Sequence, residues 1–255
     1  MIDIHNHLLP KIDDGSDSIE ESIETVLSLK EIGFDKIIIT PHYIEGSDYI
    51  TNNEKKEKLL KQLKEEIKKR KIEVQLFLGN EVYIHQNILD NIKAKEVASL
   101  ANSRYLLVEL PMENEILELD TIIFNCLIDD VVPIIAHPER YRYFQKYPGK
   151  MADLIEQGAL FQVNYGSIVG QYGKEAMKTA KYMLKNNYVS FLGTDTHHTK
   201  DFVYNNFNKI YKTITKISGK TKAKELTEIN PYKILANKVI DSPVIGEKKK
   251  LHFFK

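Results

Sequence analysis

The N-terminal stretch of the chain contains side chains that can bind metal ions. The sequence MIDIHNHLLPKIDDGS places His5 and His7 one residue apart, with Asp13 and Asp14 shortly after them. Alternate residues of an extended segment point to the same side, so the two imidazoles can bind one ion together. Two histidines do not distinguish a metal site from a structural pair, so the interpretation depends on partners elsewhere in the chain.

Apolar, β-branched runs predict seven strands that would have to position those partners. They lie at 2–5, 36–40, 74–79, 105–109, 132–136, 161–164 and 189–193. Helical patterns lie between them, at 19–32, 54–71, 86–98, 115–130, 150–157, 173–187 and 200–218, with one more helical stretch after 220. Alternating strands and helices are typical of a parallel sheet, and seven such units in about 200 residues favour a barrel over an open sheet. We therefore expect an α/β fold and a single domain over residues 1–255.

Ligand-type residues follow six of the seven predicted strands. In a parallel barrel the C-terminal ends of the strands meet on one face, where catalytic residues collect. The residues are His5 and His7 after the first strand, His42 after the second, Glu81 after the third, Glu109 at the end of the fourth, His137 after the fifth, and Asp195 and His197 after the seventh. The sixth strand ends in NYGS and supplies none. Imidazoles and carboxylates gathered in this way suit several divalent ions.

Composition narrows the class of protein. Lys plus Arg and Asp plus Glu each number 36, so the formal net charge is zero, whereas a general nucleic-acid or membrane-surface binder would show a basic excess. The chain has one cysteine, Cys126, and no secretory signal or long apolar run. We therefore expect a cytoplasmic protein with no nucleic-acid partner and no membrane insertion.

Six motifs, taken together, resemble a known superfamily. HNHLLPKIDDGS, TPHY, GNEVY, VELP, AHPERY and GTDTHH occur in this order, as in the polymerase and histidinol phosphatase (PHP) superfamily. The DDG after the HxH pair, the HPERY motif and the late Asn230–Pro231 pair are similar to a narrower group. That group is the bacterial manganese-dependent tyrosine-protein phosphatases of capsular and exopolysaccharide operons. The likeness is strong over residues 1–200, and it implies a distorted seven-stranded (β/α)7 barrel of the PHP type.

The resemblance also implies a metal site with two to three divalent ions, Mn²⁺ first, with Fe, Co or Zn as alternatives. By the family pattern, His5, His7, Glu81 and Asp195 hold one ion, Glu81 bridges to a second held with Glu109 and His137, and Asp14, His42 and His197 hold the third. Asp13 is interpreted as a turn residue before Gly15. His85, His198 and His252 are interpreted as lying outside the clusters.

Arg140 is the predicted catalytic and substrate-binding cation. It follows His137 by three residues, and a guanidinium can hold two phosphate oxygens at once, although a salt-bridged surface role is the alternative. The family carries a second arginine after the last ligand, where this chain has HHTKDF, so Lys200 is the candidate replacement and that contact stays open. Tyr43 and Tyr49 are candidates to line the pocket, with packing of the loop as the equal alternative.

The expected chemistry is hydrolysis of a phosphomonoester. We expect a hydroxide shared by two ions to attack phosphorus in line, while the third ion and Arg140 neutralise the phosphate oxygens. A cysteine-dependent phosphatase needs a C-x5-R loop, but Val132 stands six residues after Cys126, which is interpreted as a core residue. An open rim, with Tyr141 and Tyr143 possible neighbours, would accept an aryl group by stacking. The resemblance implies a phosphotyrosine substrate, the Tyr-rich tail of a bacterial tyrosine kinase that regulates polysaccharide export.

Other functions use similar ligands. A histidinol-phosphatase-type enzyme would need the same metals, and so would a PHP nuclease, which the balanced charge disfavours. A metal-dependent amidohydrolase often carries a carboxylated lysine at the fourth strand end, where this chain has Glu109. A non-catalytic binding module is the weakest alternative, because the ligand set is complete.

Overall fold

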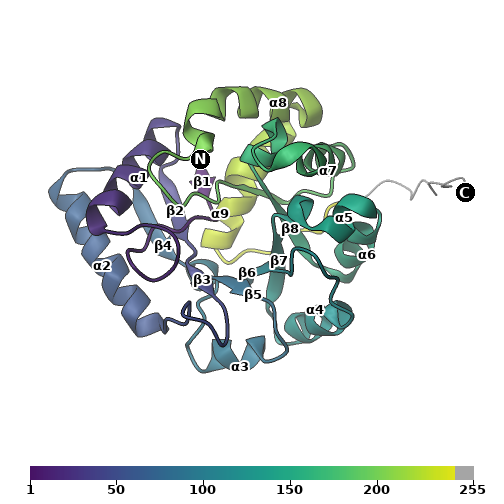
Figure 1. Cartoon of the computed structure of the whole chain (residues 1–255), viewed down its shortest axis with the longest axis horizontal. Coiled ribbons are helices and arrows are strands. Elements are labelled where there is room, and N and C mark those ends of the chain that lie inside the picture. The colour runs from purple at the N-terminus through teal and green to yellow at the C-terminus, as the bar shows by residue number, and fades with distance from the viewer. Residues whose placement is uncertain (245–255) are drawn as a thin grey trace, which may run out of the picture.

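Parallel strands form the centre of the molecule in the computed structural model, which describes residues 1–244 (Figure 1). The strands are β1 (Ile2–Asp3), β2 (Lys36–Ile39), β3 (His42–Tyr43), β4 (Gln75–Leu78), β5 (Glu81–Tyr83), β6 (Tyr105–Glu109), β7 (Val132–Ala136), β8 (Leu160–Asn164) and β9 (Phe191–Gly193). Every pairing between them in the described residues is parallel. The predicted α/β fold with parallel strands is therefore confirmed.

The hydrogen-bonded strands form two sheets rather than one closed ring. Their orders are β1-β2-β4 and β3-β5-β6-β7-β8-β9 in the described part of the chain. An isolated parallel bridge between Asn6 and Thr196 brings the ends of β1 and β9 together. The second and third predicted strands each continue past a bend, into β3 and β5, and these bends separate the two sheets.

A buried polar network holds the two bends together. The side chain of Asn80 donates to the carbonyl of Pro41 (2.8 Å) and accepts from the backbone amide of Ala98 (2.9 Å). The Nζ atom of Lys56 donates to the side-chain oxygen of Asn80 and to the carbonyl of Glu96. Lys56 is fully buried, so these contacts are shielded from water. The network fixes the turns that lead directly into His42 and Glu81.

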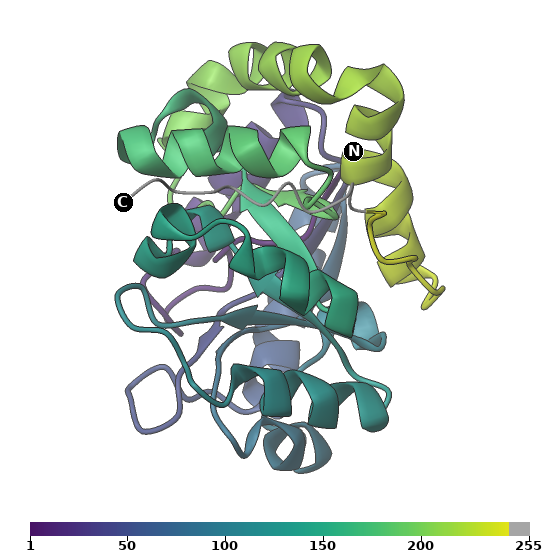
Figure 2. The same ribbon diagram turned by 90° about the vertical axis from the view of Figure 1, so that its right-hand side faces the viewer.

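Helices surround the strands (Figures 1 and 2). They are α1 (Ile19–Glu31), α2 (Asn53–Lys69), α3 (Ile88–Lys93), α4 (Leu119–Ile128), α5 (Arg142–Lys146), α6 (Lys150–Gln157), α7 (Gly173–Lys185), α8 (Phe202–Lys224) and α9 (Asn230–Leu235). Short turns of 3-10 helix lie at Leu100–Asn102, Pro138–Arg140 and Gly166–Val169, and a π-helical turn lies at Glu225–Ile229. None of the helices in residues 1–244 combines the length and hydropathy that crossing a bilayer requires.

Side-chain caps define where the first two helices begin. The hydroxyl of Ser18 accepts from the amide of Glu21 (3.2 Å), and the side chain of Asn52 accepts from the amide of Lys55 (3.0 Å). Each cap satisfies an amide that has no partner within the helix. One face of α2 is buried and the other carries charged residues, as an amphipathic surface helix should.

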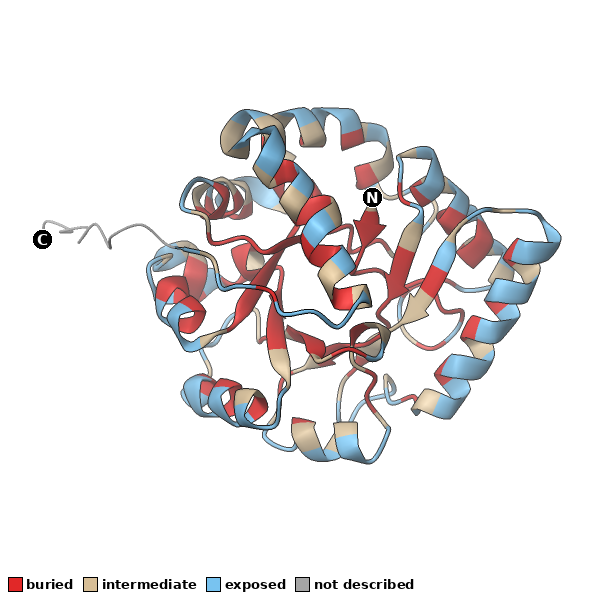
Figure 3. Cartoon of the chain, turned by 180° about the vertical axis from the view of Figure 1, so that it is seen from behind, coloured by how far each residue is buried: buried red, intermediate tan, exposed pale blue. Residues whose placement is uncertain are grey.

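The two faces of the strands pack into two separate apolar clusters. Leu106 and Val108 of β6 belong to the larger cluster, which lies between strands and helices. Tyr105 and Leu107, which alternate with them, belong to an interior cluster with residues of the other strands and of α9. Helix α9 lies behind the strands in Figure 1, and the view from behind in Figure 3 shows buried residues at the centre of the molecule. The strands are therefore apolar on both faces, as parallel strands usually are.

Two sequence predictions concern residues outside the metal site. Cys126 is a buried free thiol in α4, which confirms its interpretation as a core residue. His252 lies outside the described residues.

Candidate metal and phosphate site

The predicted ligands gather at the C-terminal ends of the strands. His42 and Glu81 begin the short strands β3 and β5, Glu109 ends β6, and the others lie in the loops that follow β1, β7 and β9. Four groups of potential ligand atoms have all their atoms within 4.8 Å of one another. The groups are His7, Asp14, His42 and His197; His5, His7 and Glu81; His5, His137 and Asp195; and His42, Glu81 and Glu109. All nine predicted ligands therefore occur in one continuous constellation.

Glu81 lies at the centre of this constellation. One of its carboxylate oxygens, Oε2, lies 3.2 Å from Nε2 of His5 and 3.1 Å from Nδ1 of His42. The other, Oε1, lies 2.9 Å from Nε2 of His137. A carboxylate with imidazoles around both oxygens has the arrangement that a bridging metal ligand requires.

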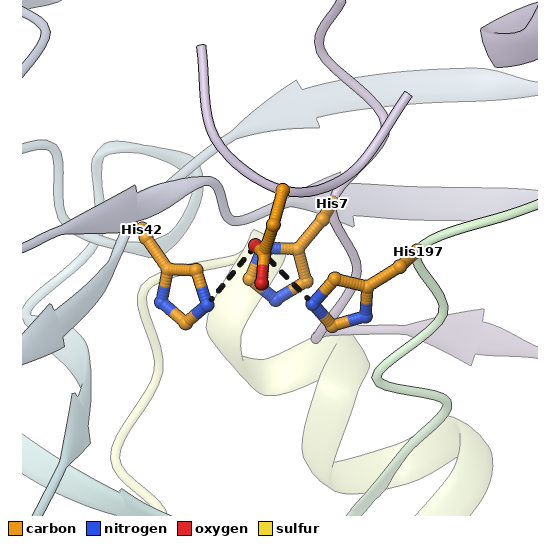
Figure 4. Close-up of side chains that lie close together, drawn as sticks. His7, His42 and His197 are labelled. Carbon is orange, nitrogen blue, oxygen red and sulfur yellow. Dashed lines mark ion pairs between the residues drawn. The ribbon is translucent and has the colours of Figure 1, made fainter. Parts of the chain in front are cut away.

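A second group of imidazoles surrounds Asp14. Figure 4 shows the rings of His7, His42 and His197 pointing toward a common centre. The Oδ1 atom of Asp14 lies 3.5 Å from Nε2 of His42 and 3.6 Å from Nε2 of His197. The ring of His7 stacks on that of His197 with centroids 4.0 Å apart. His7 therefore lies between this group and the group around Glu81.

Hydrogen bonds on the far sides of the rings orient His5 and His7. The Nδ1 atom of His7 lies 2.8 Å from the carboxylate of Asp13, and that of His5 lies 2.7 Å from the side-chain oxygen of Gln162. Both partners accept, so each ring donates from Nδ1 and directs Nε2 into the site, where the lone pair of a neutral ring can bind a cation. The two Nε2 atoms lie 3.4 Å apart. Two acceptors that face each other at this distance favour a cation between them.

Asp13 has a larger role than the predicted one. Its carboxylate accepts from the amide of Gly15 (3.0 Å), as a turn residue would. It also accepts from the amide of His42 (3.0 Å) and from the ring of His7. A Cβ on Gly15 would lie 2.0 Å from the carbonyl oxygen of His7, so only glycine allows the DDG turn to approach this closely.

Left-handed backbone aims two of the candidate ligands. His137 has φ of 33° and Asp195 has φ of 53°, values that are uncommon outside glycine. His137 follows β7 directly, and Asp195 lies two residues after the end of β9. Such conformations cost free energy and persist where the surrounding structure requires them. They turn the imidazole and the carboxylate toward the shared centre at the strand ends.

The charges of the site are poorly balanced without a cation. Burial raises the pKa of Glu109 to about 8, and the negative charge of Glu81 adds to the effect. Burial would also raise the pKa of Asp195, but the charge of His5 and a hydrogen bond from His7 hold it well below its usual range. Burial lowers the pKa of His5, yet the charges of Glu81 and Asp195 raise it to about 9. The carboxylates thus depend on positive charge from neighbouring side chains.

Several buried atoms in the site lack a hydrogen-bond partner within the described residues. They are Oε2 of Glu81, Nδ1 of His42 and Nδ1 of His137. The short contacts of Glu81 Oε2 to imidazole nitrogens do not have hydrogen-bond geometry. Buried polar atoms normally have partners, and atoms that lack one call for an explanation such as an ion. The donor set of imidazoles and carboxylates therefore fits divalent transition-metal ions.

Arg140 lies against Asp195 at the edge of the constellation. Its guanidinium donates to Oδ2 of Asp195 (2.9 Å), and its side chain is 27% exposed. The ring of Tyr172 lies below the guanidinium, with 4.5 Å from Cζ to the ring centroid. The hydroxyl of Tyr172 lies 3.5 Å from Asp195. Arg140 is therefore a positioned, partly exposed cation beside the candidate ligands and is not a surface salt-bridge residue.

The prediction that Tyr43 lines the substrate pocket is wrong, because its side chain is buried in the core. It is 2% exposed, its hydroxyl donates to Glu96 (2.8 Å) and it accepts from Asn91 (3.0 Å). These contacts hold the ring in the core, so the packing alternative describes Tyr43. Tyr141 and Tyr143 are likewise buried and stack on each other with centroids 5.7 Å apart. The phenol hydroxyls of these residues are therefore not candidates for substrate contact.

Tyr49 and Lys200 lie nearer to solvent. The ring of Tyr49 stacks on that of His42, with centroids 5.7 Å apart and an interplanar angle of 11°. Lys200 is exposed in the loop that follows His197. His198 is half exposed and pairs with Glu21 (3.1 Å), away from the ligand groups.

Three site residues were not anticipated: Gln162, Asn164 and Tyr172. Asn164 donates to Oδ2 of Asp195 (2.7 Å), and Gln162 donates to Asn164 (2.9 Å) while it accepts from His5. The sixth predicted strand therefore supplies hydrogen bonds to ligands in place of a ligand. The signal was present as alternate polar residues in FQVN, an otherwise apolar strand. Nothing local distinguishes Tyr172 from other loop tyrosines.

Comparison with known proteins supports the same family as the motifs. The family described as Capsular polysaccharide synthesis, CpsB/CapC, matches residues 1–236. A putative tyrosine-protein phosphatase CapC from Staphylococcus aureus is 33% identical over 197 residues, which is 77% of each chain. One chain from the crystal structures of YwqE from Bacillus subtilis and CpsB from Streptococcus pneumoniae, described as unique metal-dependent tyrosine phosphatases, is similar over its whole length. It is 27% identical with a TM-score of 0.88 and covers 96% of this chain.

A more distant structure shares the fold. Histidinol phosphate phosphatase from Lactococcus lactis, solved with zinc, L-histidinol and phosphate, is 14% identical with a TM-score of 0.57. The match covers 89% of this chain and 94% of the other. The arrangement of strands and helices is therefore similar to that of a PHP-type phosphatase.

Proposed function

The chain belongs to the CpsB/CapC family of capsular polysaccharide synthesis, and we propose that it is a metal-dependent protein-tyrosine phosphatase. One observation carries the proposal: imidazoles and buried carboxylates converge around Glu81, with a partly exposed guanidinium beside them. The relatives named as tyrosine phosphatases support the choice of substrate. We also propose that the two sheets form one distorted seven-stranded barrel of the PHP type, and that residues 1–255 form one domain.

Two to three divalent ions, with Mn²⁺ as the proposed metal, would be held by the predicted ligands. The first set is His5, His7, Glu81 and Asp195, the second is Glu81, Glu109 and His137, and the third is Asp14, His42 and His197. The position of His7 close to both His5 and His197 supports a site in which neighbouring ions share ligands. Bound divalent ions lower the pKa of water and stabilise the charge of attacking and leaving oxygens.

The chain's own residues bind and orient the phosphate in this proposal. Arg140 would donate to phosphate oxygens, and its contacts with Asp195 and Tyr172 hold it in place before substrate binds. Tyr49, stacked on His42 at the rim, offers an aromatic face to the substrate phenyl ring. Lys200 would supply a second, weaker phosphate contact from the following loop. The phenolate leaving group, with a pKa of about 10, needs less help from a general acid than an alkoxide.

The proposed substrate is a phosphotyrosine protein, the Tyr-rich tail of a bacterial tyrosine kinase that regulates capsular or exopolysaccharide synthesis. The exposed loops around Tyr49 support an extended, flexible segment as the substrate. A reducing compartment such as the cytoplasm is consistent with the single free thiol of Cys126.

The test compares kcat/KM on a phosphotyrosine peptide, histidinol phosphate and a single-stranded oligonucleotide, each with Mn²⁺. We expect the peptide to be hydrolysed best. A ten-fold preference for histidinol phosphate or for the oligonucleotide would refute the tyrosine phosphatase while leaving the metal site intact. Metal analysis of protein purified without chelator and supplied with Mn²⁺ should find two to three ions per chain, and one ion or none would refute the site.

A further inference from the structure

Two surfaces of the molecule have features that the proposed catalysis does not use. The first, here called the lysine groove, is hollowed between the C-terminal half of α2 and the start of strands β2 and β4. The second, here called the α4 ridge, consists of Leu117, Phe124 and Ile128. Neither contains a candidate metal ligand. Helices α2 and α4 lie on different flanks of the molecule (Figures 1 and 2).

The lysine groove combines an apolar floor with a basic rim. It has a volume of about 810 Å³, and Ile67, Ile72, Leu76 and Phe77 contribute apolar surface to it. Lys64, Lys68 and Lys71 also line it, all three are exposed, and none has an ion pair within the described residues. Asp35, Lys36 and Glu73 line it too, and Asp35 pairs with the N-terminus and with Lys36, so lysines outnumber carboxylates in the lining. Strand β4 lies at the edge of its sheet here. An occupant must therefore offer apolar side chains together with negative charge.

The α4 ridge complements the lysine groove, because it presents exposed apolar side chains flanked by acidic residues. Phe124 and Ile128 are 62% and 66% exposed, and they lie four residues apart on one face of the helix. Leu117, just before the helix, is 96% exposed. Acidic residues flank the ridge, including Asp120, which is four residues from Phe124 and has no ion pair among residues 1–244. Residues 113–131 contain no lysine or arginine, although basic residues from other segments pair with Glu113, Glu115, Asp129 and Asp130.

We propose that the α4 ridge of one molecule docks in the lysine groove of a second copy. An amphipathic helix that places apolar anchors in a groove is a common recognition mode. The lysines of the groove would face Asp120 and Glu118, which have no ion pair among residues 1–244. Contact between two ridges would place acidic residues face to face, and contact between two grooves would place lysines face to face. Like charges repel, so both symmetric arrangements are disfavoured. Each molecule would use its ridge and its groove with different neighbours, which is a head-to-tail association.

Two variants test this arrangement by measuring mass in sedimentation equilibrium. The ridge variant is Phe124→Asp and the groove variant is Lys64→Glu with Lys68→Glu. We expect the parent protein to exceed its monomer mass of 29.5 kDa as concentration rises from about 5 to about 500 µM. Added salt should weaken the association, because it screens the lysine–carboxylate contacts. Each variant alone should remain at the monomer mass.

A mixture of the two variants gives the decisive result. The ridge variant keeps an intact groove and the groove variant keeps an intact ridge, so the mixture should form pairs of one to one and nothing larger. Val239→Asp and Lys209→Glu, matched changes at exposed positions elsewhere, should associate as the parent does. The proposal is overturned if the parent stays monomeric over the whole range, if the ridge variant associates normally, or if the mixture does not pair.

Discussion

The two ends of the same strands differ in what they bury and how completely they bury it. On β6, Tyr105 and Leu107 pack in the interior apolar cluster, while Glu109, on the same face two residues later, belongs to the ligand constellation. On β9, Phe191 packs in the interior cluster and Asp195 follows at the other end. The apolar end gains free energy from removal of surface from water, whereas the polar end brings carboxylates together out of water.

The comparison shows how the polar end is maintained. Its ligands are fixed by side chains from other strands, as Gln162 fixes His5 and Asn164 fixes Asp195, and by left-handed backbone at His137 and Asp195. The apolar end needs only shape and volume. We therefore expect stability to depend mainly on the apolar end and activity mainly on the polar end.

The largest expected effect is a loss of activity without a loss of folding, caused by a change at the polar end. His5→Ala should lower kcat/KM on an aryl phosphate by at least about 1,000-fold, because bound metal supplies several kcal/mol of transition-state stabilisation. Circular dichroism should show an intact fold, since the apolar clusters do not include His5. The matched change His198→Ala, at a half-exposed position, should keep most of the activity. Equal losses in the two variants would show that His5 has no special role.

The converse change tests the apolar end. Leu107→Ala should lower the free energy of unfolding by roughly 2–5 kcal/mol, because it leaves a cavity in a fully buried cluster. The kcat/KM per folded molecule should stay close to that of the parent. Urea unfolding combined with assays of the folded fraction would measure both quantities. A large loss of kcat/KM in the folded fraction would mean that packing at the apolar end also determines activity at the polar end.

A smaller effect distinguishes substrate binding from metal binding within the polar end. Arg140→Ala should lower kcat/KM on an aryl phosphate by about 10- to 100-fold, since a charge-assisted contact contributes roughly 1.5–3 kcal/mol. Its metal content should fall much less than that of His5→Ala. Arg142→Ala is the matched control, because Arg142 forms an exposed ion pair with Glu113 (3.0 Å). Unchanged kinetics in Arg140→Ala would contradict the proposed phosphate contact.

The smallest expected effect concerns Lys56, at the bends between the two ends. Burial lowers its pKa from 10.5 to about 7, so between these values the unfolded chain binds more protons than the folded chain. The free energy of unfolding of the parent, relative to Lys56→Met, should therefore rise with pH, by roughly 1–2.5 kcal/mol between pH 7 and 9.

Below pH 7 the difference between the parent and Lys56→Met should level off, because Lys56 is then protonated in both states. Lys58→Met, at an exposed position of the same helix, should show no such dependence. A difference between parent and Lys56→Met that stays flat between pH 7 and 9 would mean that Lys56 keeps its charge when folded.

The sequence was sufficient to predict the principal elements, because they depend on local patterns. The ranges 105–109 and 132–136 coincide with β6 and β7, and 150–157 coincides with α6. The predicted ligands also lie together, since parallel strands bring their C-terminal ends to one side. Two short strands were missed, β3 and β5, because each begins after a bend that tertiary contacts of Asn80 support.

Residue types and their order along the chain determined that imidazoles and carboxylates would meet at the strand ends. Only the tertiary structure decided which residues of a given type, among several in the chain, contribute to the site. Tyr43 and Tyr141 are in the core while Tyr49 and Tyr172 contact site residues, and Asp13 supports His7 while Asp14 faces three imidazoles. The direction of a loop side chain depends on contacts with segments far away in the sequence, such as Tyr172 with Arg140. Those contacts do not exist until the strands are paired, so no local pattern encodes them.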